Sequence, residues 1–177
     1  MAVIELQFKA SLEGLTDLAP NEAAGPEEGA APYLWHFKVQ CGSCREVSEN
    51  LVTIARTDSS KISGSRGEAN LVMRCKGCKR EGSMSIMDEQ PRAFTDQDKG
   101  FVTMLALDCR GMEPVEFDPC GEWKARGSES GTVFDDVNLD EGEWFGYDEE
   151  AGEAVSVSDI KTQFVAAKKA RGKGKTK

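Results

Sequence analysis

Residues 35–44 read Trp-His-Phe-Lys-Val-Gln-Cys-Gly-Ser-Cys, an alternation of apolar and polar side chains that runs directly into a C-x-x-C pair. Apolar residues at every second position predict a half-buried β-strand. A tight turn at the end of such a strand can hold two thiolates on one side of a loop. The stretch therefore predicts a strand that presents Cys41 and Cys44 to a metal ion.

A second C-x-x-C pair, Cys75 and Cys78, follows with 30 residues between the two pairs. Residues 71–74 predict a strand entering this pair, and Met84 and Ile86, which alternate with serines, predict the return strand of a hairpin. Four thiolates complete the tetrahedron that zinc prefers. We predict one zinc ion per chain, held by Cys41, Cys44, Cys75 and Cys78.

The spacing between the pairs is longer than the 15–20 residues of a compact zinc finger. The intervening segment is therefore expected to be folded itself, with a hairpin turn at residues 64–67. Four protein sulfurs leave no coordination position for water or substrate, so we expect a structural site and no enzyme activity.

Cations surround both pairs in an otherwise acidic chain, and they could offset the thiolate charge or bind phosphate: Arg45, Arg74, Lys76, Lys79 and Arg80. The cysteines themselves have two other interpretations. They could be small buried side chains, or a redox dithiol. A redox pair works best when its first cysteine opens a helix, and no amphipathic helix follows Cys41.

The rest of the chain also has a β pattern. Apolar residues alternate over residues 4–12, a second run begins at residues 101–109, and Val155 and Val157 indicate a closing strand. Long helical periodicity is missing, and short helical turns are expected only near residue 96 or residues 140–147. We predict a mainly β fold of sandwich or barrel-like architecture with few short helices.

Two segments of the chain, 97 residues apart, resemble each other. Their alignment pairs Phe8 with Leu105 and Gly14 with Gly111. Short matches of this kind also arise by chance. We predict two similar β lobes, residues 1–92 with the zinc site and residues 93–167 without one. Residues 19–32, which contain three prolines and no large apolar side chain, are expected to form a flexible loop, and residues 168–177 a disordered basic tail.

Composition favours a soluble protein of 177 residues, 39% of them hydrophobic. The net charge is −9, and removing the six cations of residues 168–177 leaves −15 for residues 1–167. Such a surface repels nucleic acid except at a local patch or the tail. The chain has no apolar run of roughly 18 residues, and we expect no export signal. We expect a monomer in the cytoplasm, with the nucleus as a second location and no membrane contact.

Other polar residues give weaker signals. His36 is placed on the strand face opposite Trp35 and Phe37, and is expected to be a surface or hydrogen-bonded side chain rather than a ligand. Cys109 is expected in the core and Cys120 in a turn. Side chains with oxygen atoms alternate over residues 136–142, as in a calcium-binding loop. The glycine lies one position later than such a loop requires, so we do not expect calcium binding there.

Several stretches resemble the eukaryotic CXXC-motif-containing zinc-binding proteins from about residue 3 to residue 165. They are Cys41-Gly-Ser-Cys44, Cys75-Lys-Gly-Cys78, Cys109-Arg-Gly-Met-Glu-Pro-Val-Glu-Phe117, Glu129-Ser-Gly-Thr132 and Gln163-Phe-Val165. The resemblance implies a β-rich fold of two similar halves, with zinc in the first half on the four cysteines above. Residues 19–32 and the basic tail depart from the family pattern.

We expect a non-catalytic zinc-binding protein that acts through an unidentified protein partner or in metal homeostasis. The first alternative is a nucleic-acid-binding zinc module that uses the cations beside the cysteines and the tail. The second is a thiol oxidoreductase, in which a C-x-x-C pair would cycle between dithiol and disulfide.

Overall fold

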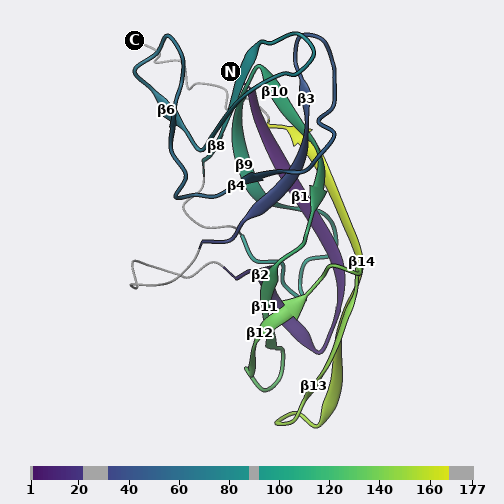
Figure 1. Ribbon diagram of the computed structural model, residues 1–177. Helices are drawn as coiled ribbons and strands as arrows, with labels where there is room; N and C mark the ends of the chain where they lie inside the picture. The colour runs from purple at the N-terminus through teal and green to yellow at the C-terminus, as the bar shows by residue number, and fades with distance from the viewer. Residues whose placement is uncertain (1, 22–31, 88–91, 168–177) are drawn as a thin grey trace, which may run out of the picture.

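The computed structural model describes residues 2–21, 32–87 and 92–167, and all regular elements in these segments are β-strands (Figure 1). The prediction of a mainly β fold is confirmed. Where short helical turns were expected, the described chain has single hydrogen-bonded turns instead. Asp98 N donates to Thr95 O at 3.1 Å, and Gly142 N donates to Leu139 O at 2.9 Å.

The strands form four antiparallel sheets. The largest has the order β13-β14-β1-β9-β8-β7, two have three strands each, β10-β3-β4 and β12-β11-β2, and β5 and β6 form a short ribbon. The bounds are β1 Ala2–Glu13, β2 Leu15–Pro20, β3 Trp35–Cys41, β4 Val52–Ile54, β5 Ser60–Lys61, β6 Glu68–Ala69, β7 Leu71–Arg74, β8 Glu81–Ile86, β9 Val102–Arg110, β10 Met112–Asp118, β11 Glu122–Gly127, β12 Val133–Asn138, β13 Trp144–Asp148 and β14 Glu153–Ala166.

Strand β1 lies inside the six-stranded sheet and organises it. Ile4, Leu6 and Phe8 are buried and the residues between them are half-buried, as the alternation predicted. Leu6 pairs with Leu105 of β9 on one side and with Phe164 of β14 on the other. Figure 1 shows β1 and β14 running the length of the molecule, between β11, β12 and β13 at one end and β3, β10 and β6 at the other.

Aromatic side chains in the core join the sheets, among many buried aliphatic residues. Phe8 stacks on Trp123 of β11 with ring centroids 5.4 Å apart, and Phe94 meets Phe8 edge to face at 5.7 Å. Trp35 and Phe37 of β3 are fully buried beside Phe117 of β10. Phe37 also meets Phe164 of β14 edge to face at 5.9 Å, which connects this sheet to the six-stranded sheet. Burying a large apolar side chain contributes about 1.5–3 kcal/mol, so these rings stabilise the packing of the three sheets.

Two glycines make equivalent turns in the two similar segments. Gly14 joins β1 to β2 with φ +68°, and Gly111 joins β9 to β10 with φ +72°. This left-handed conformation is unfavourable for residues with a side chain. A Cβ at Gly14 would lie 2.9 Å from Val155, and one at Gly111 would lie 3.0 Å from the carbonyl oxygen of Glu81.

The predicted loop at residues 19–32 begins too early. Ala19 and Pro20 belong to β2, are buried, and pair with Lys124 and Trp123 of β11. Proline is tolerated there because β2 is an edge strand, where no hydrogen bond is required on one side. Residues 22–31 and the predicted basic tail, residues 168–177, lie outside the described residues.

The division into lobes at residues 92 and 93 remains a prediction. Strands from both predicted lobes share sheets, since β1 pairs with β9 and β14, and β3 pairs with β10. In the described segments, no helix has the length and apolar character needed to cross a membrane.

Candidate metal centre

The first cysteine pair lies in a tight loop directly after β3. Within this loop, residues 41–46, which we call knuckle 1, the amide of Cys41 donates to the carbonyl oxygen of Glu46 at 2.9 Å. The amide of Arg45 donates back to the carbonyl oxygen of Cys41 at 3.1 Å. Arg45 has φ +67°, so the chain reverses at once after Cys44 and brings both sulfurs to one side.

The second pair repeats this geometry between β7 and β8. In knuckle 2, residues 75–80, the amide of Cys75 donates to the carbonyl oxygen of Arg80 at 2.9 Å, and the amide of Lys79 donates to the carbonyl oxygen of Cys75 at 3.0 Å. Lys79 has φ +64°. The strand, C-x-x-C turn and return strand predicted from the sequence are therefore confirmed, and the two knuckles match position by position.

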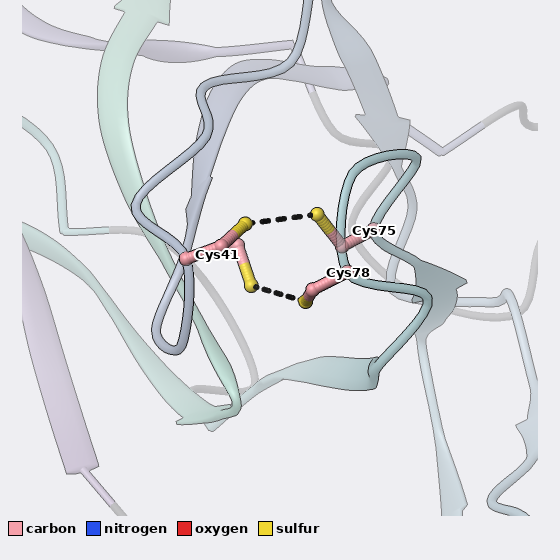
Figure 2. Close-up of side chains that lie close together, drawn as sticks. Cys41, Cys75 and Cys78 are labelled. Carbon is pink, nitrogen blue, oxygen red and sulfur yellow. Dashed lines mark hydrogen bonds between the residues drawn. The ribbon is translucent and has the colours of Figure 1, made fainter.

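The four sulfur atoms meet in the space between the knuckles. Cys41 Sγ lies 3.6 Å from Cys78 Sγ, Cys44 Sγ lies 3.4 Å from Cys75 Sγ, and all four lie within 4.8 Å of one another. Figure 2 shows the sulfurs of Cys75 and Cys78 directed across the gap toward the loop that carries Cys41. A zinc–sulfur bond of about 2.3 Å gives a tetrahedron with edges of about 3.8 Å. The two short sulfur–sulfur distances lie slightly below this edge and the upper limit of 4.8 Å lies above it, so small shifts of the sulfurs in both directions would fit a zinc ion.

Gly111, far from both cysteine pairs in the sequence, lies between the knuckles. Its carbonyl oxygen accepts a hydrogen bond from the amide of Gly42 in knuckle 1 at 3.0 Å. On its other side, the space where a Cβ would be is closed by Glu81, the first residue after knuckle 2. The spacing of the cysteines does not predict that Gly111 contacts both knuckles. The one available signal was the glycine at the strand junction in Cys109-Arg110-Gly111-Met112.

The backbone of knuckle 1 favours the thiolate form of its first cysteine. Hydrogen bonds from the amides of Cys44 and Ser43 lower the pKa of Cys41 to about 6, and Ser43 N lies 3.4 Å from Cys41 Sγ. At Cys75, the amide of Cys78 lowers the pKa, but burial and the Cys44 thiol raise it more, so the pKa lies above its ordinary value. At neutral pH, Cys41 is therefore mostly in the thiolate form, which is the form that binds metal.

The predicted cations flank the cluster, and all five are exposed. Arg80 of knuckle 2 reaches across to knuckle 1, where its guanidinium donates to Ser43 Oγ at 3.3 Å. An acidic residue of knuckle 1 extends in the opposite direction, to knuckle 2, a contact that the spacing of the cysteines does not indicate. Glu46 of knuckle 1 extends to knuckle 2, and its Oε2 lies 3.5 Å from Cys75 Sγ.

The remaining candidates lie away from the cluster. Cys109 is buried in β9, as predicted, and burial raises its pKa to about 12. Cys120 lies in a turn closed by its own amide and the carboxylate of Asp118 at 3.0 Å. His36 is half-buried, and its Nδ1 lies 2.9 Å from the carbonyl oxygen of Leu34. Residues 64–67 form the predicted hairpin turn, in which Ile62 N donates to Gly67 O at 3.2 Å.

Among the described residues, the four cysteines form the one group of three or more His, Cys, Asp or Glu side chains close enough to hold a metal. The acidic run at residues 136–142 does not form such a group.

Comparison with known proteins agrees with this geometry. Residues 5–165 match the family described as CXXC motif containing zinc binding protein, eukaryotic. A protein of that name from Bos taurus is 42% identical over 166 residues, which cover 93% of this chain and 99% of the relative.

Solved structures share the fold. The crystal structure of C1orf123 matches with a TM-score of 0.82 and 38% identity, over 93% of this chain and 99% of that one. A hypothetical protein from Plasmodium falciparum has a TM-score of 0.78 at 20% identity, over 93% and 100% of the two chains. With its matched C-x-x-C knuckles and this extent of similarity, the chain belongs to the eukaryotic CXXC-motif-containing zinc-binding proteins.

Proposed function

We propose that each chain binds one zinc ion through Cys41, Cys44, Cys75 and Cys78, and that the ion has a structural rather than a catalytic role. The observation that carries the proposal is the meeting of four sulfurs within 4.8 Å between two matched knuckles. Four sulfur ligands fill a tetrahedral shell, so water and substrate have no position at the metal.

Because the two knuckles belong to different sheets, an ion bound by both would connect these sheets. Knuckle 1 follows β3 of a three-stranded sheet, and knuckle 2 joins β7 and β8 of the six-stranded sheet. A single ion bound by both would cross-link the two sheets at this end of the molecule. Apparent binding free energies of structural zinc in small fingers are about 10–16 kcal/mol, enough to order two short exposed loops.

Elemental analysis of the purified protein tests this role. We expect about one zinc per chain in the wild type and almost none after Cys75→Ser and Cys78→Ser are combined, together with a lower melting temperature. Cys120→Ser is the matched control, because Cys120 is partly exposed and lies in a separate turn. A double variant that keeps its zinc, or a wild type without zinc, would contradict the proposal.

We further propose that the protein acts by binding a protein partner, or in metal homeostasis, in the cytoplasm and the nucleus. A cavity of about 250 Å³ beside the knuckles supports partner binding. Its lining combines apolar side chains, among them Val47 and Met73, with the cations Arg74 and Arg80. Val47→Asp should abolish capture of a partner by the zinc-loaded protein while leaving its zinc content unchanged. Equal capture by both proteins would argue against this surface.

Nucleic-acid binding is the alternative that the exposed cations of the knuckles favour. Phosphate contacts make such binding strongly dependent on salt. The alternative predicts binding of RNA or DNA at low salt that weakens after truncation at Lys168, and no binding at low salt would eliminate it. A thiol oxidoreductase is less well supported, because both C-x-x-C pairs lie in hairpin loops and not at the start of a helix.

A further inference from the structure

Glu46 places a carboxylate against the cysteine cluster in addition to the four sulfurs. Its Oε2 lies 3.5 Å from the sulfur of Cys75, although Glu46 belongs to knuckle 1 and Cys75 to knuckle 2. The crossing depends on the turn of knuckle 2. A Cβ at Gly77 would collide with Oε2 of Glu46, so the absence of a side chain at residue 77 leaves room for this carboxylate.

The equivalent position in knuckle 2 carries the opposite charge. The carbonyl oxygens of Glu46 and Arg80 accept the same hydrogen bond from the first cysteine of their knuckles, each at 2.9 Å. A carboxylate is a common zinc ligand, whereas a guanidinium has no lone pair to offer. The two knuckles thus match in backbone, but only knuckle 1 has a carboxylate at this position, and that carboxylate lies at Cys75 of knuckle 2.

We propose that Glu46 is a reserve ligand of the metal centre, able to replace Cys75 and give a site of three sulfurs and one carboxylate oxygen. The proposal rests on the zinc binding proposed above and concerns how the ion is exchanged. One metal–sulfur bond is replaced by one metal–oxygen bond. Both donors carry one negative charge, so the charge of the site is unchanged.

The exposure of the ligands agrees with exchange on this side of the cluster. Cys75 is half-buried and borders the cavity beside the knuckles together with Glu46, whereas Cys41, which also borders this cavity, is only 7% exposed. Cys44 is exposed but does not line this cavity. A carboxylate that holds the ion while Cys75 detaches lowers the barrier to release, because the ion never loses a ligand without gaining another. The centre would then pass zinc to an acceptor faster than four sulfurs alone allow.

A comparison of paired variants tests the ligand. In Cys75→Ala, Glu46 should hold the fourth position, so zinc stays bound with weakened affinity and its X-ray absorption shows three sulfurs and one oxygen. Because water would give the same shell, the oxygen is assigned to Glu46 by the further loss of affinity when Glu46 is also replaced. Adding Glu46→Gln should weaken zinc binding by a further factor of about 10–100, the range for residues that support a metal site. Adding Glu46→Gln to Cys78→Ala should change affinity about twofold at most, because Glu46 contacts Cys75.

Glu49→Gln is the matched control. Glu49 borders the same cavity, but it has no hydrogen bond or ion pair with a cysteine in the described segments. If Glu46→Gln weakens zinc binding by Cys75→Ala no more than Glu49→Gln does, the proposal is wrong. Circular dichroism of each variant shows whether the fold is kept.

Release kinetics provide a test that does not require Cys75→Ala to fold. Zinc transfer from the intact protein to a coloured chelator should slow about tenfold in Glu46→Gln. Gly77→Ala should slow it similarly, since the added methyl displaces the carboxylate without removing its charge. Unchanged rates in both variants would overturn the proposal. A wild type that holds no zinc would instead overturn the proposed function, so the two failures are distinguishable.

Discussion

Glu46 and Arg80 occupy the same position in the two knuckles, and their side chains cross in opposite directions. The Glu46 carboxylate lies 3.5 Å from Cys75 of knuckle 2, and the Arg80 guanidinium donates to Ser43 of knuckle 1 at 3.3 Å. Four thiolates and a zinc ion carry a net charge of −2, which a cation offsets and a carboxylate increases. The Arg80 side chain therefore reduces the negative charge at the metal centre, and the Glu46 side chain increases it.

Arg80→Gln should weaken zinc binding by up to about tenfold, the lower part of the range for supporting residues, because Arg80 is exposed. The effect should shrink at high salt, which screens the charge. Competition with a chelator at two ionic strengths measures both. Arg66→Gln, in the exposed turn at residues 64–67, is the control, and equal affinities of the two variants would refute the electrostatic role of Arg80.

Gly111→Ala should lower the free energy of unfolding by about 1–3 kcal/mol, because φ of +72° is unfavourable with a side chain and the new methyl would press on Glu81. Urea denaturation measures the change. Gly64→Ala separates the two causes, since Gly64 has φ +71° but no atom within 4 Å of an added Cβ. If both variants lose the same stability, the close contact at Gly111 contributes nothing.

Asp148→Asn should lower the melting temperature at neutral pH. Asp148 is 1% exposed and accepts hydrogen bonds from Ser130, Thr132 and the amides of Glu150 and Ala151, so it joins the turn after β11 to the turn after β13. The hydrogen bond from Ser130, with those of the amides and Thr132, outweighs burial and lowers the pKa of Asp148.

Because the pKa of Asp148 is lower in the folded state, its contribution is fully present above the unfolded pKa of about 3.9 and is lost as pH falls through the lower folded value. The melting temperature of the wild type should therefore fall more steeply than that of Asp148→Asn below about pH 4. Asp136→Asn, at an exposed site, should behave as the wild type does. Parallel acid profiles for wild type and Asp148→Asn would contradict the assignment.

Phe8→Ala should lower the free energy of unfolding by about 3–5 kcal/mol, because a fully buried ring is lost between Trp123 and Phe94. Phe8 lies in one predicted lobe, and both neighbours lie in the other. We therefore expect near- and far-ultraviolet circular dichroism to report one coincident transition in the wild type and the variant. Two separate transitions would instead favour lobes that unfold independently.

Local patterns in the sequence were sufficient to predict the strands around the cysteines and the two knuckles. Alternation identified β3 and the start of β1, because a strand that packs one face on a core must alternate. The C-x-x-C spacing predicted that the four sulfurs would meet, and they do. The ligand assignment itself remains a prediction.

Features that depend on distant partners could not be predicted in this way. Pro20 looked like part of a loop, and its place in β2 follows from pairing with Trp123, about a hundred residues away. The position of Gly111 between the knuckles depends on how β9 and β10 pair with β8 and β3. The crossing of Glu46 to Cys75 depends on the relative orientation of two loops, which no spacing within either loop records.

Zinc X-ray absorption of the purified wild-type protein shows directly whether four cysteines bind the metal. We expect a first shell of four sulfurs at about 2.3 Å, with no oxygen or nitrogen ligand in the resting protein. A shell with fewer sulfurs, or with water at the metal, would contradict a closed structural site on Cys41, Cys44, Cys75 and Cys78.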